Sequence, residues 1–183
     1  MPSQPAGLPD RDALLPDGRW KVDPDRSSVA FEVRHLGVAR VRGTFGAFEC
    51  RFEGGERLRI DGVVDVASLA TGDAVRDERL ISSEFFAAAE HPTITFTAGR
   101  ATPDAGGWRI EGELTIRGVT RPLALEVSRV DHDDGAVGMT ARGTLSRKDF
   151  GLVWDALVEA GRLVVADRVA ALLDVVVVRD DRA

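Results

Sequence analysis

The side chains of this chain best suited to metal binding, or to acid–base chemistry near neutral pH, are three histidines, His35, His91 and His132. They lie far apart in the sequence, and none has cysteine or carboxylate partners at the ligand spacing of a metal site. His132, within the run DHDDG, is expected in a solvated turn, and His91, which precedes Pro92, in a loop. We therefore expect no metal site.

Motifs of the common enzyme classes are also missing from the sequence. It contains no Gly-rich phosphate loop before a helix, no His-Glu-x-x-His and no Gly-x-Ser-x-Gly elbow. These absences favour a protein that is not an enzyme and that needs no cofactor.

His35 is the histidine whose position is most informative. It continues the odd-numbered alternation of Val29, Phe31 and Val33, so its side chain is expected on the same face of a strand as theirs. A polar group on an apolar face needs a hydrogen-bond partner from the protein, water or a ligand. A structural histidine is the preferred interpretation, and an acid or base in an apolar cavity is the alternative.

Charged residues gather around the last irregular stretch of the sequence, at Arg147, Asp149, Asp155 and Asp167. We expect opposite charges to pair there at the surface, where ion pairs contribute little stability. Their spacing gives no support to a general acid–base pair.

The composition restricts the classes of partner. The chain has 183 residues, and 24 basic against 30 acidic side chains give a formal charge of −6, which disfavours nucleic-acid binding and general attraction to anionic membranes. Cys50 is the only cysteine, so an internal disulfide and a multi-cysteine zinc site are excluded. The N-terminal sequence lacks the pattern of a signal peptide, and no run of about 18 apolar residues follows, so we expect a cytoplasmic protein without stable membrane insertion.

Hydropathy patterning predicts one domain. Residues 1–18 are rich in Pro, Gly and Asp and lack periodicity, which is typical of a flexible N-terminal segment. Residues 19–179 carry strand-like alternation over most of their length, with no change of composition that would indicate a second domain.

The clearest strand signal is the stretch 108–127, WRIEGELTIRGVTRPLALEV, which predicts a β-hairpin with one apolar face. Trp108, Ile110, Leu114 and Ile116 alternate with polar residues before the turn, and apolar residues alternate again after it. A hairpin cannot bury such a face alone, so it must belong to a larger sheet that encloses either a packed core or a cavity.

Similar alternation elsewhere predicts about eight to ten strands joined by short turns, and the many glycines favour closure into a barrel over a sandwich. One helical insertion interrupts them at about residues 73–90. Asp73 is expected to cap a first short helix that ends near Leu80, and Ser82 or Ser83 a second helix that ends before Pro92.

The sequence resembles the YceI-like family of lipocalin-like, lipid-binding barrels, from about Trp20 to Val178. Four segments in the same order carry the resemblance: SSVAFEVRHLGVARVRGTFGAF, SLATGDAVRDERLISSEFFAAAEHPTITF, GELTIRGVTRPLALEV and RKDFGLVWDALVEAGRLVVADRVAALLDVVV. The chain departs from the family at Ser27, where members often have His. The resemblance implies an all-β, eight-stranded antiparallel barrel whose lumen accommodates a polyisoprenoid or similar amphiphile.

Strand parity, together with the two phenylalanines of the helical insertion, predicts the residues that line this lumen. They are Phe31, Val33, His35, Val64, Phe85, Phe86, Ile94, Phe96, Leu114, Ile116, Leu125, Met139, Phe150 and Trp154. Gly43, Gly112 and Gly143 fall among the inward positions, and we expect gaps over them where a thin hydrocarbon could lie.

The predicted function is therefore non-enzymatic binding, transport or sequestration of a hydrophobic ligand, which would be an isoprenoid, an isoprenoid quinone or a fatty acyl amphiphile. One alternative is an enzyme that acts on a lipid-like or quinone substrate in the same barrel, with His35 or a carboxylate as acid or base. The other is a solid-core interaction module with an acidic surface. A homodimer is compatible with an open-ended barrel.

Overall fold

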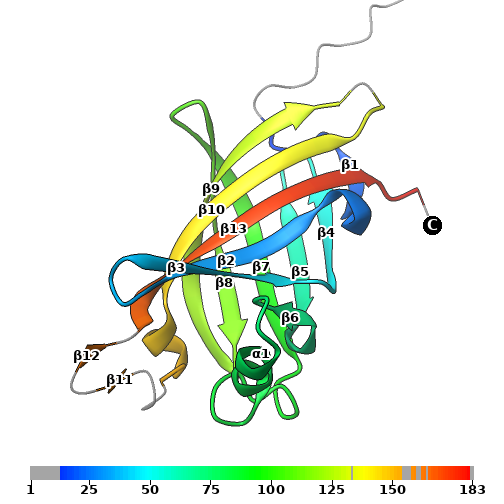
Figure 1. Ribbon diagram of the computed structural model, residues 1–183. Helices are drawn as coiled ribbons and strands as arrows, with labels where there is room; N and C mark the ends of the chain where they lie inside the picture. Colours follow the sequence, from blue (N-terminus) through cyan, green and yellow to red (C-terminus); the bar gives the residue numbers. More distant parts are fainter. Residues whose placement is uncertain (1–12, 133, 154–157, 160–161, 164, 182–183) are drawn as a thin grey trace, which may run out of the picture.

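In the computed structural model, the described residues are 13–132, 134–153, 158–159, 162–163 and 165–181. Eight antiparallel strands form a closed barrel among them, as the sequence predicted (Figure 1). In spatial order these strands are β1 (Gly18–Val22), β4 (Phe48–Gly54), β5 (Arg59–Asp65), β7 (Thr93–Asp104), β8 (Gly107–Ile116), β9 (Val119–Asp131), β10 (Val137–Ser146) and β13 (Val165–Arg179). The ring closes where β13 pairs with β1.

Strand β13 is long enough to pair with two strands along one edge. Its C-terminal end pairs with β1, where Val22 faces Val177, and the rest pairs with β2 (Ser28–His35), from Asp174 opposite Ser28 to Val165 opposite His35. A 3-10 turn, η1 (Pro24–Arg26), separates β1 from β2.

Ser27 bridges this interruption. Its Oγ donates to the carbonyl of Asp23 at 2.6 Å and accepts a hydrogen bond from the backbone N–H of Val176 at 2.9 Å. Ser27 therefore ties the break between β1 and β2 to β13.

Strand β3 (Ala39–Phe45) forms a hairpin with β2 and leaves part of its other edge open. That edge pairs only with β6 (Leu69–Ala70), and only at Thr44 and Phe45. Within the described part of the chain, residues 39–43 of β3 have no strand on this side. Helix α1 (Ala74–Ile81) lies below β3 in the view of Figure 1, at the same end of the barrel.

The helical insertion has one helix where the sequence predicted two. Asp73 caps α1, as expected, by accepting a hydrogen bond from the backbone N–H of Arg76 at 3.0 Å. The predicted second helix is wrong: residues 82–90 form consecutive turns, and Ser82 is the C-terminal cap of α1. Ala87 has a left-handed backbone with φ of 52°, which no α-helix accommodates.

These turns bury Phe85 and Phe86 together. The two rings meet edge to face with centroids 5.1 Å apart, and Phe86 meets Phe45 of β3 in the same way at 6.5 Å. The insertion thus covers part of this end of the barrel with aromatic side chains. The remaining short elements of the described chain are η2 (Val66–Ser68), η3 (Arg147–Phe150), β11 (Val158–Glu159) and β12 (Arg162–Leu163).

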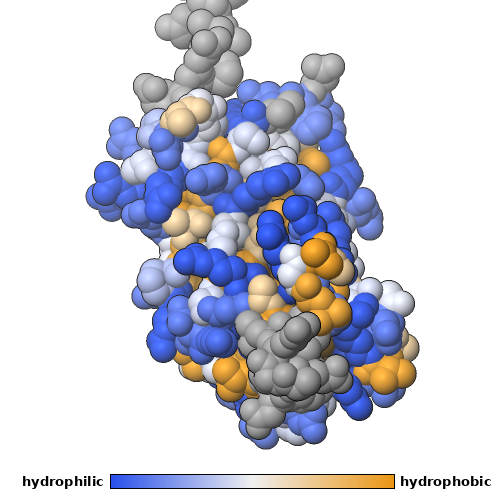
Figure 2. All heavy atoms as spheres, turned by 60° about the vertical axis from the view of Figure 1, so that its left-hand side comes forward, coloured by the Kyte–Doolittle hydropathy of each residue, from blue (hydrophilic) through white to orange (hydrophobic). Residues whose placement is uncertain are grey.

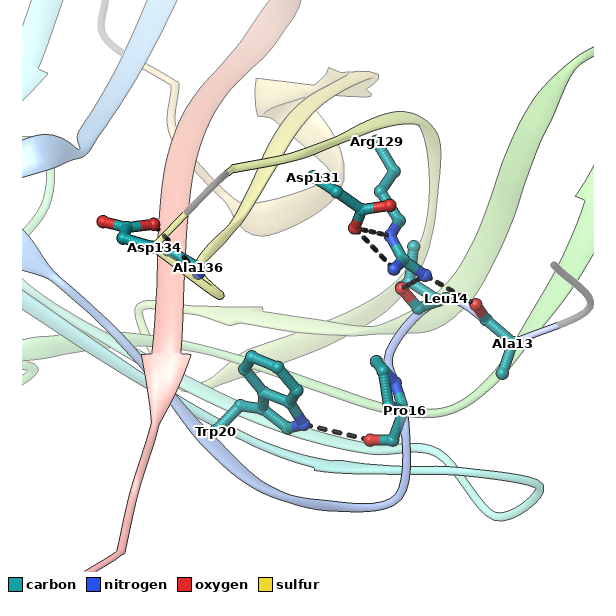
Figure 3. A network of polar contacts seen from close by, with 8 residues as sticks. All are labelled: Ala13, Leu14, Pro16, Trp20, Arg129, Asp131, Asp134 and Ala136. Atoms are coloured by element: carbon teal, nitrogen blue, oxygen red, sulfur yellow. Dashed lines mark hydrogen bonds and ion pairs between the residues drawn. The ribbon is translucent and has the colours of Figure 1, made fainter. Parts of the chain in front are cut away.

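The opposite end of the barrel is covered by residues 13–17, although their composition predicted a flexible segment. Leu14 and Leu15 are buried in the core, with Leu15 fully inaccessible to solvent. Arg129 of β9 donates from Nη1 to the carbonyls of Ala13 and Leu14, both at 3.0 Å, while its Nη2 lies 2.6 Å from Asp131 (Figure 3).

Further contacts fix the end of this segment. Trp20 Nε1 donates to the carbonyl of Pro16 at 3.0 Å, as Figure 3 shows, and the backbone N–H of Gly55 donates to that of Leu15 at 2.9 Å. The guanidinium of Arg179 stacks over the Trp20 ring at 4.3 Å. Residues 13–17 therefore act as a plug for this end of the barrel.

We expect Leu15→Ala to lower the free energy of unfolding by about 2–5 kcal/mol, because it leaves a cavity under the plug. Urea unfolding followed by tryptophan fluorescence measures the change. Val38→Ala is the control, since this side chain is 90% exposed and its truncation is expected to change stability by about 0.5 kcal/mol or less. Equal stability of the two variants would contradict the plug.

Candidate ligand-binding cavity

The barrel encloses a cavity of about 650 Å³, which falls within the range of small-molecule binding sites. Inward-facing side chains of all eight barrel strands, and of β2 and β3, form its wall. Most of this wall is apolar, and its few polar side chains include His35, Arg147 and residues beside α1. An eight-stranded barrel has room for either side chains or one ligand, and this one is not filled by its own side chains.

Twelve of the fourteen predicted lining residues lie on the cavity wall. They are Phe31, Val33, His35, Val64, Phe85, Phe86, Ile94, Phe96, Leu114, Ile116, Leu125 and Met139. Phe150, in η3, is packed in the hydrophobic core and is not among the wall residues. Trp154 lies outside the described residues.

The hairpin of β8 and β9 has the inward and outward faces that its alternation predicted. Ile110, Leu114 and Ile116 of β8 line the cavity together with Leu123, Leu125 and Val127 of β9. Arg117 and Gly118 make the turn, both with positive φ, and the register pairs Ile110 with Leu125. The apolar face of this hairpin is thus wall rather than solid core.

The expected gaps over the inward glycines are wrong, because neighbouring side chains occupy them. A Cβ on Gly43 would lie 2.3 Å from Cζ of Phe31, and one on Gly112 would lie 2.5 Å from Cζ of Phe96. At Gly143, such an atom would come within 2.8 Å of Leu125 Cδ2. The two glycines on β3 and β8 therefore let aromatic rings lie close to the barrel wall, so the lumen is wider than it would be with any other residue there.

Cys50 is the nucleophilic side chain on the apolar wall. Burial, with a smaller contribution from the charge of Asp61, raises the pKa of its thiol to about 12. The thiol is therefore neutral at physiological pH and contributes apolar surface rather than a reactive thiolate.

Arg147 is the one fully buried charged residue of the described chain, with 3% of its surface exposed, and it borders the cavity. The expectation that it forms a surface ion pair is wrong. Its Nη1 donates to the carbonyl of Leu152 at 2.6 Å and its Nε to that of Ala166 at 3.1 Å. A third bond runs from Nη2 to the carbonyl of Val165 at 3.2 Å, so the guanidinium ties η3 to the start of β13. Burial lowers the pKa of Arg147, and the charge of Asp167 opposes that shift.

The rim of the cavity beside α1 is polar. Thr71, Asp73, Arg76 and Arg79 contribute to it. Arg76 donates from Nε to Thr71 Oγ1 at 2.7 Å and from Nη2 to the Thr71 carbonyl at 3.1 Å. This pair of bonds holds one cationic group at the rim.

His35 lies at the end of β2 and borders the same cavity, opposite Ala39 of β3 in the hairpin. Within the described residues, its imidazole has no hydrogen bond to a carboxylate, and no group of three metal-binding side chains is present.

Comparison with known proteins agrees with this architecture. The sequence profile of the YceI-like domain matches residues 20–177. The chain belongs to the YceI-like family. It is 31% identical over 147 residues to protein YceI of Escherichia coli O17:K52:H18 (strain UMN026 / ExPEC), with 74% of this chain and 77% of the relative covered.

Two solved structures show the same fold. Burkholderia cenocepacia BcnA superposes with a TM-score of 0.76 at 20% identity, over 85% of this chain and 98% of that one. A polyisoprenoid binding domain from Saccharophagus degradans gives 0.65 at 17% identity, over 87% and 98% of the two chains. No helix among the described residues is long and apolar enough to span a membrane.

Gly43→Ala is expected to narrow the lumen, since the new methyl group must push the Phe31 ring inward. We expect this overpacking to lower the free energy of unfolding by about 1–3 kcal/mol and to weaken uptake of a long-chain fluorescent fatty acid. Gly62→Ala is the matched control: it also adds a methyl group at the wall, but the nearest atom, Sγ of Cys50, lies at an ordinary 3.5 Å. Equal fatty-acid uptake by both variants would show that the contact between Gly43 and the Phe31 ring does not determine the width of the lumen.

The Cys50 thiol predicts a loss of stability in alkaline solution. Between pH 9 and 12 the thiol ionises in the unfolded chain but stays neutral in the folded protein. Its contribution to the free energy of unfolding is therefore complete below pH 9 and is lost as pH rises toward 12. Thermal unfolding of wild type and Cys50→Ala across this range isolates the effect. The melting temperature of wild type should fall more steeply than that of the variant, and parallel curves would contradict the assignment.

Proposed function

We propose that this protein binds one long-chain isoprenoid, or a similar amphiphilic lipid, in the barrel lumen and acts as a carrier or sequestering protein rather than an enzyme. The observation that carries the proposal is the apolar cavity of about 650 Å³. The same cavity argues against a solid-core interaction module. A structural neighbour described as a polyisoprenoid binding domain, from Saccharophagus degradans, gives independent support.

The wall supplies affinity without a charged anchor. Each methylene buried against it contributes about 0.8 kcal/mol, so ten methylenes contribute roughly 8 kcal/mol before the cost of ordering the ligand. The proposed ligand contacts are the twelve wall residues of the sequence prediction, which are eleven apolar side chains and His35. Selectivity would then depend on chain length and branching, which the width of the lumen limits.

The polar groups divide the cavity into an apolar interior and a polar rim. Arg76 at the rim is held by Thr71, so it can hydrogen-bond a head-group oxygen without rearrangement. Arg147 already uses each of its nitrogens on a backbone carbonyl. We therefore propose that the hydrocarbon enters first and that the head group stays beside α1.

Native mass spectrometry of the protein purified from its own host, followed by organic extraction, tests the proposal directly. We expect one bound amphiphile per protein. A preparation free of lipid that also takes up no isoprenoid alcohol or fatty acid from solution would overturn it.

Val169→Phe is expected to weaken ligand uptake about ten- to a hundredfold, because it places a ring in the lumen at a cost of about 1–3 kcal/mol. Ala170→Phe is the matched control on the next residue of β13, since Val169 lines the cavity and Ala170 does not. Titration with a fluorescent fatty acid measures both affinities. Equal losses in the two variants would indicate a general effect on folding rather than occupation of the lumen.

A further inference from the structure

The turn between β2 and β3 exposes two apolar side chains to solvent. Leu36 is 60% exposed and Val38 is 90% exposed. Leu36 also has a left-handed backbone, with φ of 50°, a conformation that favours glycine or asparagine over leucine. Exposure and backbone conformation both disfavour leucine in the isolated protein, and a residue that is unfavourable on two independent grounds indicates a role outside the fold.

The outer face of this hairpin is basic although the chain as a whole is acidic. Arg34, Arg40 and Arg42 are all exposed and alternate with inward residues, so their side chains share the outer face. Glu32 is the one acidic residue of the segment 32–42, and it pairs with Arg40 at 3.1 Å. Two arginines thus remain in excess beside the exposed apolar tip, on a chain with a formal charge of −6.

The tip lies at the opening of the cavity. His35 and Val41, which flank the turn, both line the cavity, and the adjacent edge of β3 is free of strand partners among the described residues. Val75 of α1 lines the same cavity and is 67% exposed, so it is a third exposed apolar side chain near this opening, after Leu36 and Val38. Figure 2 brings the hairpin side of the barrel forward and shows hydrophobic spheres directly beside hydrophilic ones on the lower half of this face.

A protein surface on which arginines flank apolar side chains can bind to an anionic bilayer. The apolar side chains enter the boundary between head groups and acyl chains, and the arginines contact the anionic head groups. We propose that the β2–β3 tip, Leu36 to Val38, docks this barrel on anionic lipid bilayers with the cavity opening toward the membrane. The proposal rests on the lipid-binding function, because docking at this place brings the opening to the source of the ligand.

Co-sedimentation of the full chain with lipid vesicles tests the docking. We expect binding to phosphatidylcholine vesicles that contain phosphatidylglycerol, at least tenfold weaker binding to phosphatidylcholine alone, and loss of binding at high salt. Leu36→Asp/Val38→Asp should lose at least tenfold in vesicle affinity, and Arg34→Gln/Arg42→Gln should lose most of the preference for phosphatidylglycerol.

Arg57→Gln/Arg59→Gln is the matched control. It lowers the net charge by two, as the tip variant does, but lies where β4 meets β5 at the plugged end of the barrel, and it should bind vesicles as wild type does. Uptake of a fluorescent fatty acid from vesicle-free solution, measured on every variant, separates the two proposals. Normal uptake without docking in the tip variant supports both.

Three results would overturn the docking proposal. Wild type that takes up the fatty acid but sediments with neither kind of vesicle would leave the lipid-binding function intact and remove the membrane contact. Equal losses in the tip variant and the control would assign the effect to net charge. Light scattering that shows a dimer lost in Leu36→Asp/Val38→Asp, with no vesicle binding by wild type, would assign the tip to a second copy of the chain.

Discussion

The closure of the barrel depends on β13, since this strand pairs along one edge with β10 and along the other with both β1 and β2. Ten consecutive register pairs join it to β10, from Val137–Val177 to Ser146–Arg168. On its second edge the partner changes from β1 to β2 across η1, and Ser27 keeps the break attached to β13. Because the two partners diverge, β1 continues the ring at the plugged end, whereas β2 leads into the hairpin that borders the opening.

That change of partner makes the two ends of the barrel chemically different. At the β1 end, Leu14 and Leu15 enter the core and backbone carbonyls of the plug accept hydrogen bonds from Arg129, Trp20 and Gly55. At the β2 end, the edge of β3 meets only two residues of β6, and α1 with its following turns covers the barrel instead of a strand. One end is closed by a hydrogen-bonded backbone segment, and the other is partly covered by side chains of the helical insertion.

The sequence predicted those features that depend on local pattern. Alternation along 108–127 predicted which side chains of β8 and β9 face inward, and Asp73 predicted the start of α1. Both features depend only on residues that are close together in the sequence. The break at Ala87 was not predictable, since alanine favours a helix and only tertiary burial of Phe85 and Phe86 compensates for its left-handed backbone. Arg147 was misassigned for a similar reason: its partners are backbone carbonyls as distant as Val165, and carbonyls have no signature in a sequence.

Gly43 and Gly112 show why a cavity is harder to predict than a wall. Parity placed both on the inner face, but their consequence depends on which side chain lies across from them. Phe31 and Phe96 sit against these glycines, so two of the largest side chains of the lumen occupy space next to the backbone rather than along the axis. Alanine at either position would force the facing ring to move, since its Cβ would lie within 2.5 Å of the ring. These two glycines therefore affect the width of the lumen through their contacts with aromatic rings, a dependence that the hydropathy pattern of the strands does not reveal.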